Sequence, residues 1–152
     1  MTYCNTGPHT AQNAFELAEA LKKRLPGPEV TARQLRDRTW WTGPEVFVVV
    51  DDYDLVPTSA GNPLAPLTEL AAHGADLGLH LILARRTGGA SRAVYEPLLR
   101  QLCDMSSPGL MFSGDRLEGR LLHGTASRQL PPGRALLVRR GAAPDLVQTA
   151  RP

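Results

Sequence analysis

Residues 45–58 read EVFVVVDDYDLVPT and contain the clearest signal for the class of fold. The apolar run that ends at Asp51 is typical of a strand that is buried on both faces. A second run of the same kind, LHLILAR, spans residues 79–85, and helical patterns lie before, between and after the two. Continuous apolar strands that alternate with helices predict an α/β fold with a mostly parallel sheet flanked by helices.

Composition narrows the class of protein. A chain of 152 residues fits one domain, and its 42% apolar and 21% charged residues indicate a globular protein. The net charge of +2 does not point to nucleic acid. Cys4 and Cys103 lie outside any CxxC or Cys/His pattern, so neither zinc nor a disulfide framework is predicted. No apolar run reaches the roughly 18 residues of a membrane span, and a cytosolic polypeptide is expected.

Residues that begin or end helices predict the remaining helical elements. An amphipathic helix is expected over 11–26, and Thr31 is expected to cap a second, short helix. Asn62 followed by proline opens a third helix, and Pro97 interrupts a fourth over 93–105. The apolar face predicted for the first helix consists of Phe15, Leu17, Ala18, Leu21 and Leu25.

Shorter apolar segments predict the rest of the fold. One of Trp40 and Trp41 is expected to be buried and the other to pack over the edge of the sheet, with an exposed protein-binding anchor as the alternative. A small helix is expected near 116–122. Further strands are predicted at 109–113, 135–140 and 145–150.

Two carboxylates follow the first strand directly. In open α/β sheets, ligands bind beyond the carboxyl ends of the strands. The segment VFVVVDD has the form of a Walker B motif, in which Asp51 would hold magnesium and Asp52 would stand in the position of the catalytic acid. The alternative is a plain strand-to-loop exit in which aspartates bond to turn amides.

A phosphatase site is a further alternative for the same residues. Asp52-Tyr53-Asp54 resembles the DxD motif of haloacid-dehalogenase-type phosphatases, which also need a downstream cation and a later acidic pair. Both lysines of the chain lie upstream, and only Asp115 follows a later strand. These departures count against the phosphatase interpretation.

The chain contains no phosphate-binding loop. Such a loop has the pattern G-x-x-x-x-G-K-[ST], because backbone amides and one lysine must neutralise the β- and γ-phosphates. The two lysines, Lys22 and Lys23, lie in a helical pattern, and no segment matches. We therefore expect no ATPase activity from this chain alone, and Mg-ATP binding only weakly or with a partner.

Four strings carry a resemblance to a known family: RLPGPEVT, WWTGPEVFVVVDDYDLV, GLHLILARR and PGRALLVRR. With the segments between them they resemble the C-terminal, third ATPase domain of the EccC-type motor of type VII (ESX) secretion, within the FtsK/SpoIIIE family. The likeness covers residues 14–140. It implies a partial RecA-like (P-loop NTPase-type) domain over 14–150, incomplete at its N-terminal side, after a disordered leader or non-native start at 1–13.

The resemblance also implies roles for the residues at the strand ends. Asp51 and Asp52 match the Walker B positions. Arg85 and Arg86 stand where translocases of this family carry a polar γ-phosphate sensor, and they are the other candidate nucleotide-binding residues. An arginine finger toward a neighbouring subunit, or internal pairing with Asp51, Asp52 or Asp54, remain open for the two arginines.

The function implied is that of a degenerate or partial ATPase domain in a secretion motor. It would act as an interaction module for partner EccC ATPase domains or subunits, or for secreted helical-hairpin (WXG100-type) substrates. The alternative is half of a composite Mg-ATPase whose P-loop a partner chain supplies. A DNA translocase module follows from the wider family only, and the small net charge counts against it. The location implied is cytoplasmic, at the inner face of the membrane only through partners.

Overall fold

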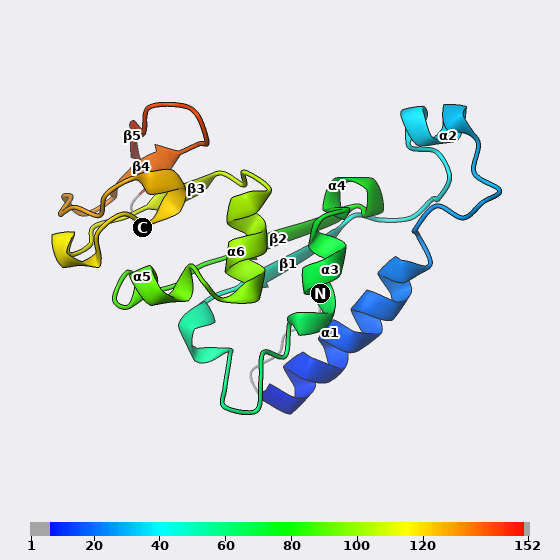
Figure 1. Cartoon of the computed structure of the whole chain (residues 1–152), viewed down its shortest axis with the longest axis horizontal. Coiled ribbons are helices and arrows are strands. Elements are labelled where there is room, and N and C mark those ends of the chain that lie inside the picture. Colours follow the sequence, from blue (N-terminus) through cyan, green and yellow to red (C-terminus); the bar gives the residue numbers. More distant parts are fainter. Residues whose placement is uncertain (1–6, 151–152) are drawn as a thin grey trace. The chain divides into compact units, whose positions relative to one another are not determined.

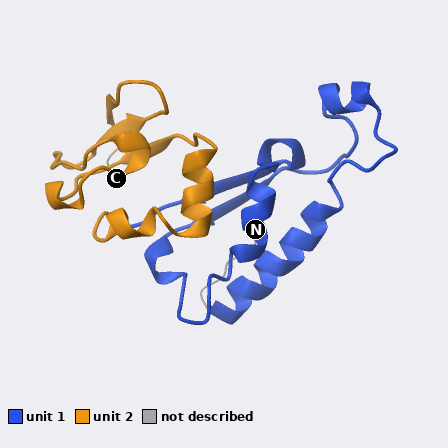
Figure 2. Cartoon of the chain, viewed as in Figure 1, with its two compact units in different colours: residues 1–85 blue, residues 86–152 orange. Residues whose placement is uncertain are grey.

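A computed structural model describes residues 7–150, whose helices and strands are drawn in Figure 1. Within this range the chain forms two compact units that follow one another in the sequence (Figure 2). The first unit ends at Arg85 and the second begins at Arg86. The segment expected to form one domain, 14–150, thus contains two units.

A pair of parallel strands lies at the centre of the first unit. Strand β1 spans Val46–Val50 and β2 spans Leu79–Leu83, with Val46 opposite Leu79 and Val50 opposite Leu83. The two strands and their parallel pairing confirm the prediction from the apolar runs. Parallel strands need a long crossover, and this one contains two helices, α3 (Ala65–Ala71) and α4 (Gly74–Leu77).

Helix α1 spans Gly7–Lys22 and packs against α3 (Figure 1). Residues 7–13 therefore belong to a helix and are not disordered; residues 1–6 of the expected leader lie outside the described part. The buried residues of α1 are Ala14, Ala18 and Leu21, whereas Phe15 is exposed. Ala18 and Leu21 of the predicted stripe are thus buried, whereas Ala14 replaces Phe15 on the buried side.

The short helix α2, Ala32–Asp37, begins as the sequence predicts. The hydroxyl oxygen of Thr31 accepts a hydrogen bond from the Gln34 amide at 3.3 Å. In return the side-chain oxygen of Gln34 accepts one from the Thr31 amide at 3.0 Å. This reciprocal capping box satisfies two amide groups that have no partner within a helix.

The two tryptophans are half-buried, and each ring nitrogen donates a hydrogen bond to a backbone carbonyl. Trp40 Nε1 donates to the carbonyl of Arg24 at 2.6 Å, and Trp41 Nε1 donates to the carbonyl of Asp76 at 2.7 Å. The Arg24 guanidinium in turn stacks over the Trp41 ring. These contacts hold both tryptophans within the unit, but neither is buried as one of them was expected to be.

The second unit contains a short antiparallel sheet rather than further parallel strands. Strands β3 (Gly109–Met111), β4 (Arg134–Val138) and β5 (Asp145–Gln148) pair in the order β3-β4-β5, and both pairs are antiparallel. Within the described residues, parallel pairing is thus limited to β1 and β2. The predicted α/β fold with a parallel sheet and flanking helices is confirmed, and the antiparallel sheet adds to it. Apolar runs predict strands without fixing their direction.

Helices and a small core complete the second unit. The predicted break at Pro97 is confirmed, since α5 spans Ala90–Ala93 and α6 spans Pro97–Asp104. Two 3-10 turns, Arg116–Glu118 and Leu122–Gly124, replace the small helix expected near 116–122. The core consists of Met111, Leu136 and Val138, with Leu121, Leu122 and Leu130 packed against it.

One carboxylate holds the segment that leads into α5. Glu118 accepts hydrogen bonds from the Gly89 amide at 2.7 Å, from the Ser91 amide at 3.2 Å and from the Ser91 hydroxyl at 3.1 Å. A residue far along the chain therefore satisfies the backbone groups at the start of this helix.

Candidate nucleotide and partner site

The carboxyl end of β1 carries the two acidic residues that the sequence predicts to be functional. Asp51 and Asp52 are both exposed. Asp52 adopts a left-handed backbone conformation, with φ 47° and ψ 45°, and its amide donates to Oδ1 of Asp51 at 3.0 Å. Aspartate adopts this conformation more readily than most residues do. The chain therefore turns sharply at Asp52, and one oxygen of Asp51 is bonded to a turn amide.

The pairing of β1 with β2 continues past the strand ends, so Arg85 follows β2 at the same edge of the sheet as the two carboxylates. The Ala84 amide donates to the carbonyl of Val50, and the Tyr53 amide donates to the carbonyl of Ala84, both at 2.8 Å. Asp51, Asp52 and Arg85 thus leave the sheet at the same edge. Arg85 is half-buried and Arg86 is exposed, and neither residue is without a partner.

The carboxylates at this edge can hold magnesium only together with other ligands. Among the described residues, no three His, Cys, Asp or Glu side chains gather to form a metal site. Magnesium in nucleotide sites takes one or two carboxylates, with waters and substrate phosphates as its other ligands. The exposed Asp51, with one oxygen still available, fits this pattern only if a phosphate supplies the remaining ligands.

One face of the β1–β2 pair is apolar and exposed. Phe47 is 61% exposed, Val49 68% and Ile82 52%, and the register places all three on one face. The fourth residue on this face is His80, whose ring stacks on Phe47 with centroids 4.4 Å apart. We call Phe47, Val49, His80 and Ile82 the open face.

The open face corrects the prediction that both sides of these strands are buried. The opposite residues, Val46, Val48 and Val50, are half-buried. A continuous apolar run does not tell which side is covered, and the sequence argument did not find the exposure. The available signal was His80, the polar residue within LHLIL, which lies on the open face.

The described helices were also compared with the length and polarity of membrane spans. None of those within residues 7–150 is long and apolar enough to cross a membrane.

Similar proteins are known for most of the chain. No family model matches it. The ESX secretion system protein EccC of Thermomonospora curvata is 50% identical over 135 residues, which are 89% of this chain and 10% of that protein. The ESX-4 secretion system protein EccC4 of Mycobacterium tuberculosis is 50% identical over 134 residues, which are 88% of this chain and 11% of that protein.

A solved structure has the same fold. It contains ATPases 2 and 3 of Thermomonospora curvata EccC in complex with a signal sequence peptide. Its TM-score is 0.91 at 47% identity, and the match covers 97% of this chain and 26% of that chain. This chain spans about a tenth of the length of the curated relatives it matches. With its mixed α/β fold and these relatives, the chain belongs to the EccC family of type VII (ESX) secretion and corresponds to an ATPase domain of that family.

Proposed function

We propose that this chain is an interaction module of an ESX secretion motor, and that its open face binds an ATPase domain of an EccC protein. The observation that carries the proposal is the exposure of Phe47, Val49 and Ile82 on one side of a parallel strand pair. Parallel sheets in α/β proteins are covered on both faces. Contiguous exposed apolar residues mark protein-binding surfaces.

The relatives support an ATPase domain as the occupant. They are long EccC chains of which this chain spans a small share. We propose that residues 14–150 are a partial RecA-like domain whose open face is covered by protein of the same family. A secreted helical segment is the other occupant to consider, since the related EccC structure contains a signal sequence peptide.

Binding to a purified EccC ATPase domain that carries a P-loop tests this proposal. The variants are Val49→Glu and Ile82→Glu, which place a charge on the open face at exposed positions. Each is expected to weaken binding by about tenfold or more, because a carboxylate buried in an apolar interface without a partner is costly. Calorimetry measures the affinity, and circular dichroism checks that the variants fold.

Leu117→Glu is the matched control, because Leu117 is a 92% exposed leucine outside the open face. It should bind as the wild type does. Equal affinities for all three variants would rule out the open face as the docking surface. Binding of a signal peptide, but not of the ATPase domain, to the wild type would assign the surface to a substrate instead.

A composite Mg-ATPase is the second candidate function, and the position of Asp51 and Asp52 favours it. Both lie at the carboxyl edge of parallel strands, where nucleotide sites form. In this proposal a partner chain supplies the P-loop, Asp51 holds magnesium and Asp52 orients the attacking water. The magnesium ion, when bound, supplies charge neutralisation at the phosphates. Arg85 and Arg86 would add positive charge beside the nucleotide.

Two measurements separate this candidate from the first. ATP hydrolysis is measured for the chain alone, for the P-loop-bearing partner alone, and for their mixture. The composite site requires a rate in the mixture above that of the partner alone, and loss of this increase in Asp52→Asn. Calorimetry with Mg-ATP, on wild type and Asp51→Ala, reports binding independently of turnover. A mixture that hydrolyses ATP no faster than the partner does would leave the interaction module as the function.

The proposed role also implies a location. We place the chain in the cytoplasm, at the inner face of the cell membrane, held there by other components of the secretion complex. Expressed with a membrane-bound EccC relative, the chain should sediment with the membrane fraction, and Val49→Glu should release it. A chain that stays in the supernatant in both cases would contradict this location.

A further inference from the structure

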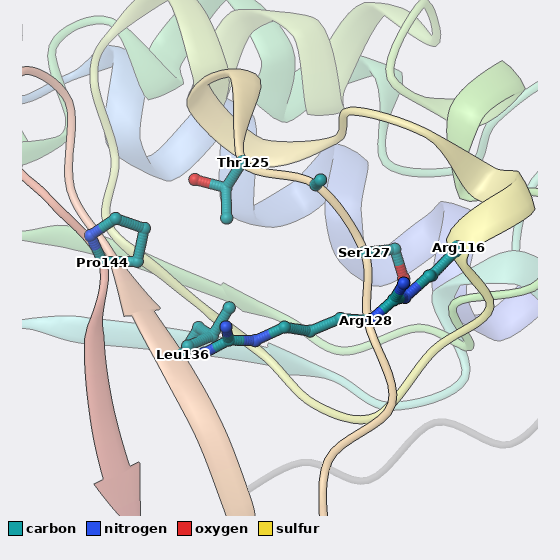
Figure 3. A pocket seen from close by; sticks show the side chains of 7 residues that line it. Arg116, Thr125, Ser127, Arg128, Leu136 and Pro144 are labelled. Atoms are coloured by element: carbon teal, nitrogen blue, oxygen red, sulfur yellow. The ribbon is translucent and has the colours of Figure 1, made fainter.

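The second unit contains a cavity of about 500 Å³ that the proposed function does not use. Small-molecule pockets in proteins have volumes of about 300–1,000 Å³. The residues that line it and carry the argument are Arg116, Thr125, Ser127, Arg128, Leu136 and Pro144 (Figure 3). They come from the 3-10 turn Arg116–Glu118, from the segment 125–128, from β4 and from the residue before β5.

Two arginines at this cavity have no acidic partner. Among the described residues, the guanidinium groups of Arg116 and Arg128 form no hydrogen bond and no ion pair, whereas Arg100 pairs with Asp104 and Arg139 with Asp145. Figure 3 shows the Arg116 side chain running toward Ser127, and the Arg128 side chain running toward Leu136. None of the residues that line the cavity is acidic. Two unneutralised cations at one cavity favour an anion there.

A buried hydroxyl at the same cavity also lacks a partner. Ser127 is 3% exposed, and its Oγ is the one buried side-chain polar atom within residues 7–150 without a hydrogen bond. The backbone of this segment is fixed, because the Ser127 amide donates to the carbonyl of Gly119 at 2.9 Å and the Gly114 amide donates to that of Arg128 at 3.1 Å. The Oγ atom is closed off from solvent, and a Cβ atom at Gly114 would lie 2.5 Å from it. The hydroxyl therefore belongs to the wall behind the cavity, and the arginines and Thr125 are the groups that can contact a ligand.

The chemistry of the remaining residues narrows the ligand. Arginine matches the geometry of phosphate and carboxylate oxygens, and two arginines match the double charge of a phosphate group better than the single charge of a carboxylate. Thr125 adds a second hydroxyl, and Leu136 with Pro144 adds an apolar wall. The volume exceeds what an inorganic ion needs, so an organic group has room beside the anion.

We propose that this cavity binds the phosphate group of a small organic phosphate. Arg116 and Arg128 donate to the phosphate oxygens, and the hydroxyl of Thr125 is a further donor at the cavity. The organic part lies against Leu136 and Pro144. This site shares no residue with the Asp51 edge or with the open face, and it does not depend on the proposed function.

Calorimetry with three probes tests the proposal: inorganic phosphate, phenyl phosphate and benzoate. Phenyl phosphate is expected to bind most tightly, because it uses both the cations and the apolar wall. Benzoate, which has a similar ring and one charge fewer, is expected to bind at least about tenfold more weakly. Affinity should fall as salt is added, since the cations are exposed. No saturable binding of phenyl phosphate, or equal binding of benzoate, would overturn the proposal.

Variants identify the residues involved. Arg116→Gln and Arg128→Gln should each weaken phenyl phosphate binding by about tenfold or more, as expected for the loss of a charged hydrogen bond. The matched control is Arg36→Gln, which removes an exposed arginine that does not line the cavity. Asp51→Ala should likewise have no effect, which separates this site from a nucleotide site at the end of β1.

Ser127→Ala tests the buried hydroxyl. It should leave phenyl phosphate binding near that of the wild type, because the Oγ atom is closed off from the cavity. It should leave the free energy of unfolding equal or higher, because the hydroxyl has no partner to lose. Thr125→Val, at a half-buried hydroxyl that lines the cavity, should weaken phenyl phosphate binding. Wild-type affinity in both arginine variants would overturn the assignment of the cavity.

Discussion

The guanidinium carbon of Arg24 lies 4.3 Å from the centre of the Trp41 ring. The same guanidinium group donates hydrogen bonds to the carbonyl of Leu77 at 2.8 Å and to that of Pro44 at 3.1 Å. One side chain thus joins the segment after α1, the entrance to β1 and the end of α4. The open face can be presented as a rigid surface because these contacts hold both strands at their amino ends.

Arg24→Lys is expected to destabilise the first unit. Lysine keeps the charge but cannot donate to two carbonyls while stacking on a ring, so we expect a loss of about 1–2 kcal/mol in the free energy of unfolding. Urea unfolding followed by tryptophan fluorescence measures the change. Lys23→Met is the control, since Lys23 is exposed, and a loss of similar size there would contradict the role given to Arg24.

Gly78→Ala is expected to disturb the packing of the Trp41 ring, on which Arg24 also stacks. Gly78 has φ +66°, and a Cβ atom at this position would lie 2.7 Å from Cη2 of Trp41. The left-handed conformation alone costs a non-glycine residue about 1–2 kcal/mol, and displacement of the tryptophan adds to it. A shift in the tryptophan emission spectrum together with a lower unfolding midpoint is the expected result.

The control for Gly78 is Gly88→Ala, because no atom lies within 4 Å of the Cβ position there. Its unfolding midpoint should stay near that of the wild type. If both glycine variants lose the same stability, close packing against Trp41 is not the cause.

Glu118→Ala is expected to release the start of α5. The carboxylate accepts three hydrogen bonds from Gly89 and Ser91, and a hydrogen bond to a charged group makes a net contribution of about 1.5–3 kcal/mol after the exchange with water. Amide exchange at Gly89 and Ser91 should become faster by at least about tenfold.

A surface ion pair provides the comparison for Glu118. Glu19 contacts Lys22 at 2.7 Å with both side chains about half exposed, and ion pairs in such exposed positions contribute little to stability. Glu19→Ala should therefore leave amide exchange in the second unit unchanged. Slow exchange at Gly89 in Glu118→Ala would show that the carboxylate does not hold this segment.

The thiol of Cys103 is expected to lose its proton at a higher pH than an ordinary cysteine thiol does. Burial raises the pKa of its thiol, and the nearby Asp104 carboxylate raises it further. A thiol whose pKa is higher in the folded protein contributes stability that is present below its ordinary pKa. That stability is lost as the pH rises through the folded value. Because the Asp104 carboxylate raises the pKa of the thiol, Asp104→Asn should lower the pKa of Cys103 and speed its alkylation at mildly alkaline pH.

Alkylation rates against pH, in a Cys4→Ser background, measure this prediction for a single thiol. The midpoint of the rate profile for Cys103 should lie above that of the unfolded chain. It should move down in Asp104→Asn. A midpoint that does not move would assign the shift to burial alone.

The parts of the fold set by neighbouring residues could be predicted. The cap at Thr31, the break at Pro97 and the two parallel strands follow from local patterns and are present. The antiparallel direction of β3–β5 could not be predicted, because an apolar run is the same in either direction. Exposure of Phe47 and Val49 was missed for a similar reason, since burial depends on what packs against a strand.

The candidate sites could also be predicted only in part. The position of Asp51 and Asp52 at the end of a strand follows from the order of residues, and the structure places them there. Their roles remain predictions. The cavity of Arg116, Ser127 and Arg128 was not predicted, because it depends on backbone contacts such as that between Gly114 and Arg128, which no sequence pattern encodes.

The different connections of the two sheets have a consequence for the order of folding. Strands β4 and β5 are joined by residues 139–144, so their hairpin closes a small loop, whereas β1 and β2 are separated by residues 51–78 with two helices between them. Closing the larger loop costs more chain entropy before any strand contact forms. Amides of β4 should therefore gain protection early in refolding, and those of β1 only when α3 and α4 are in place.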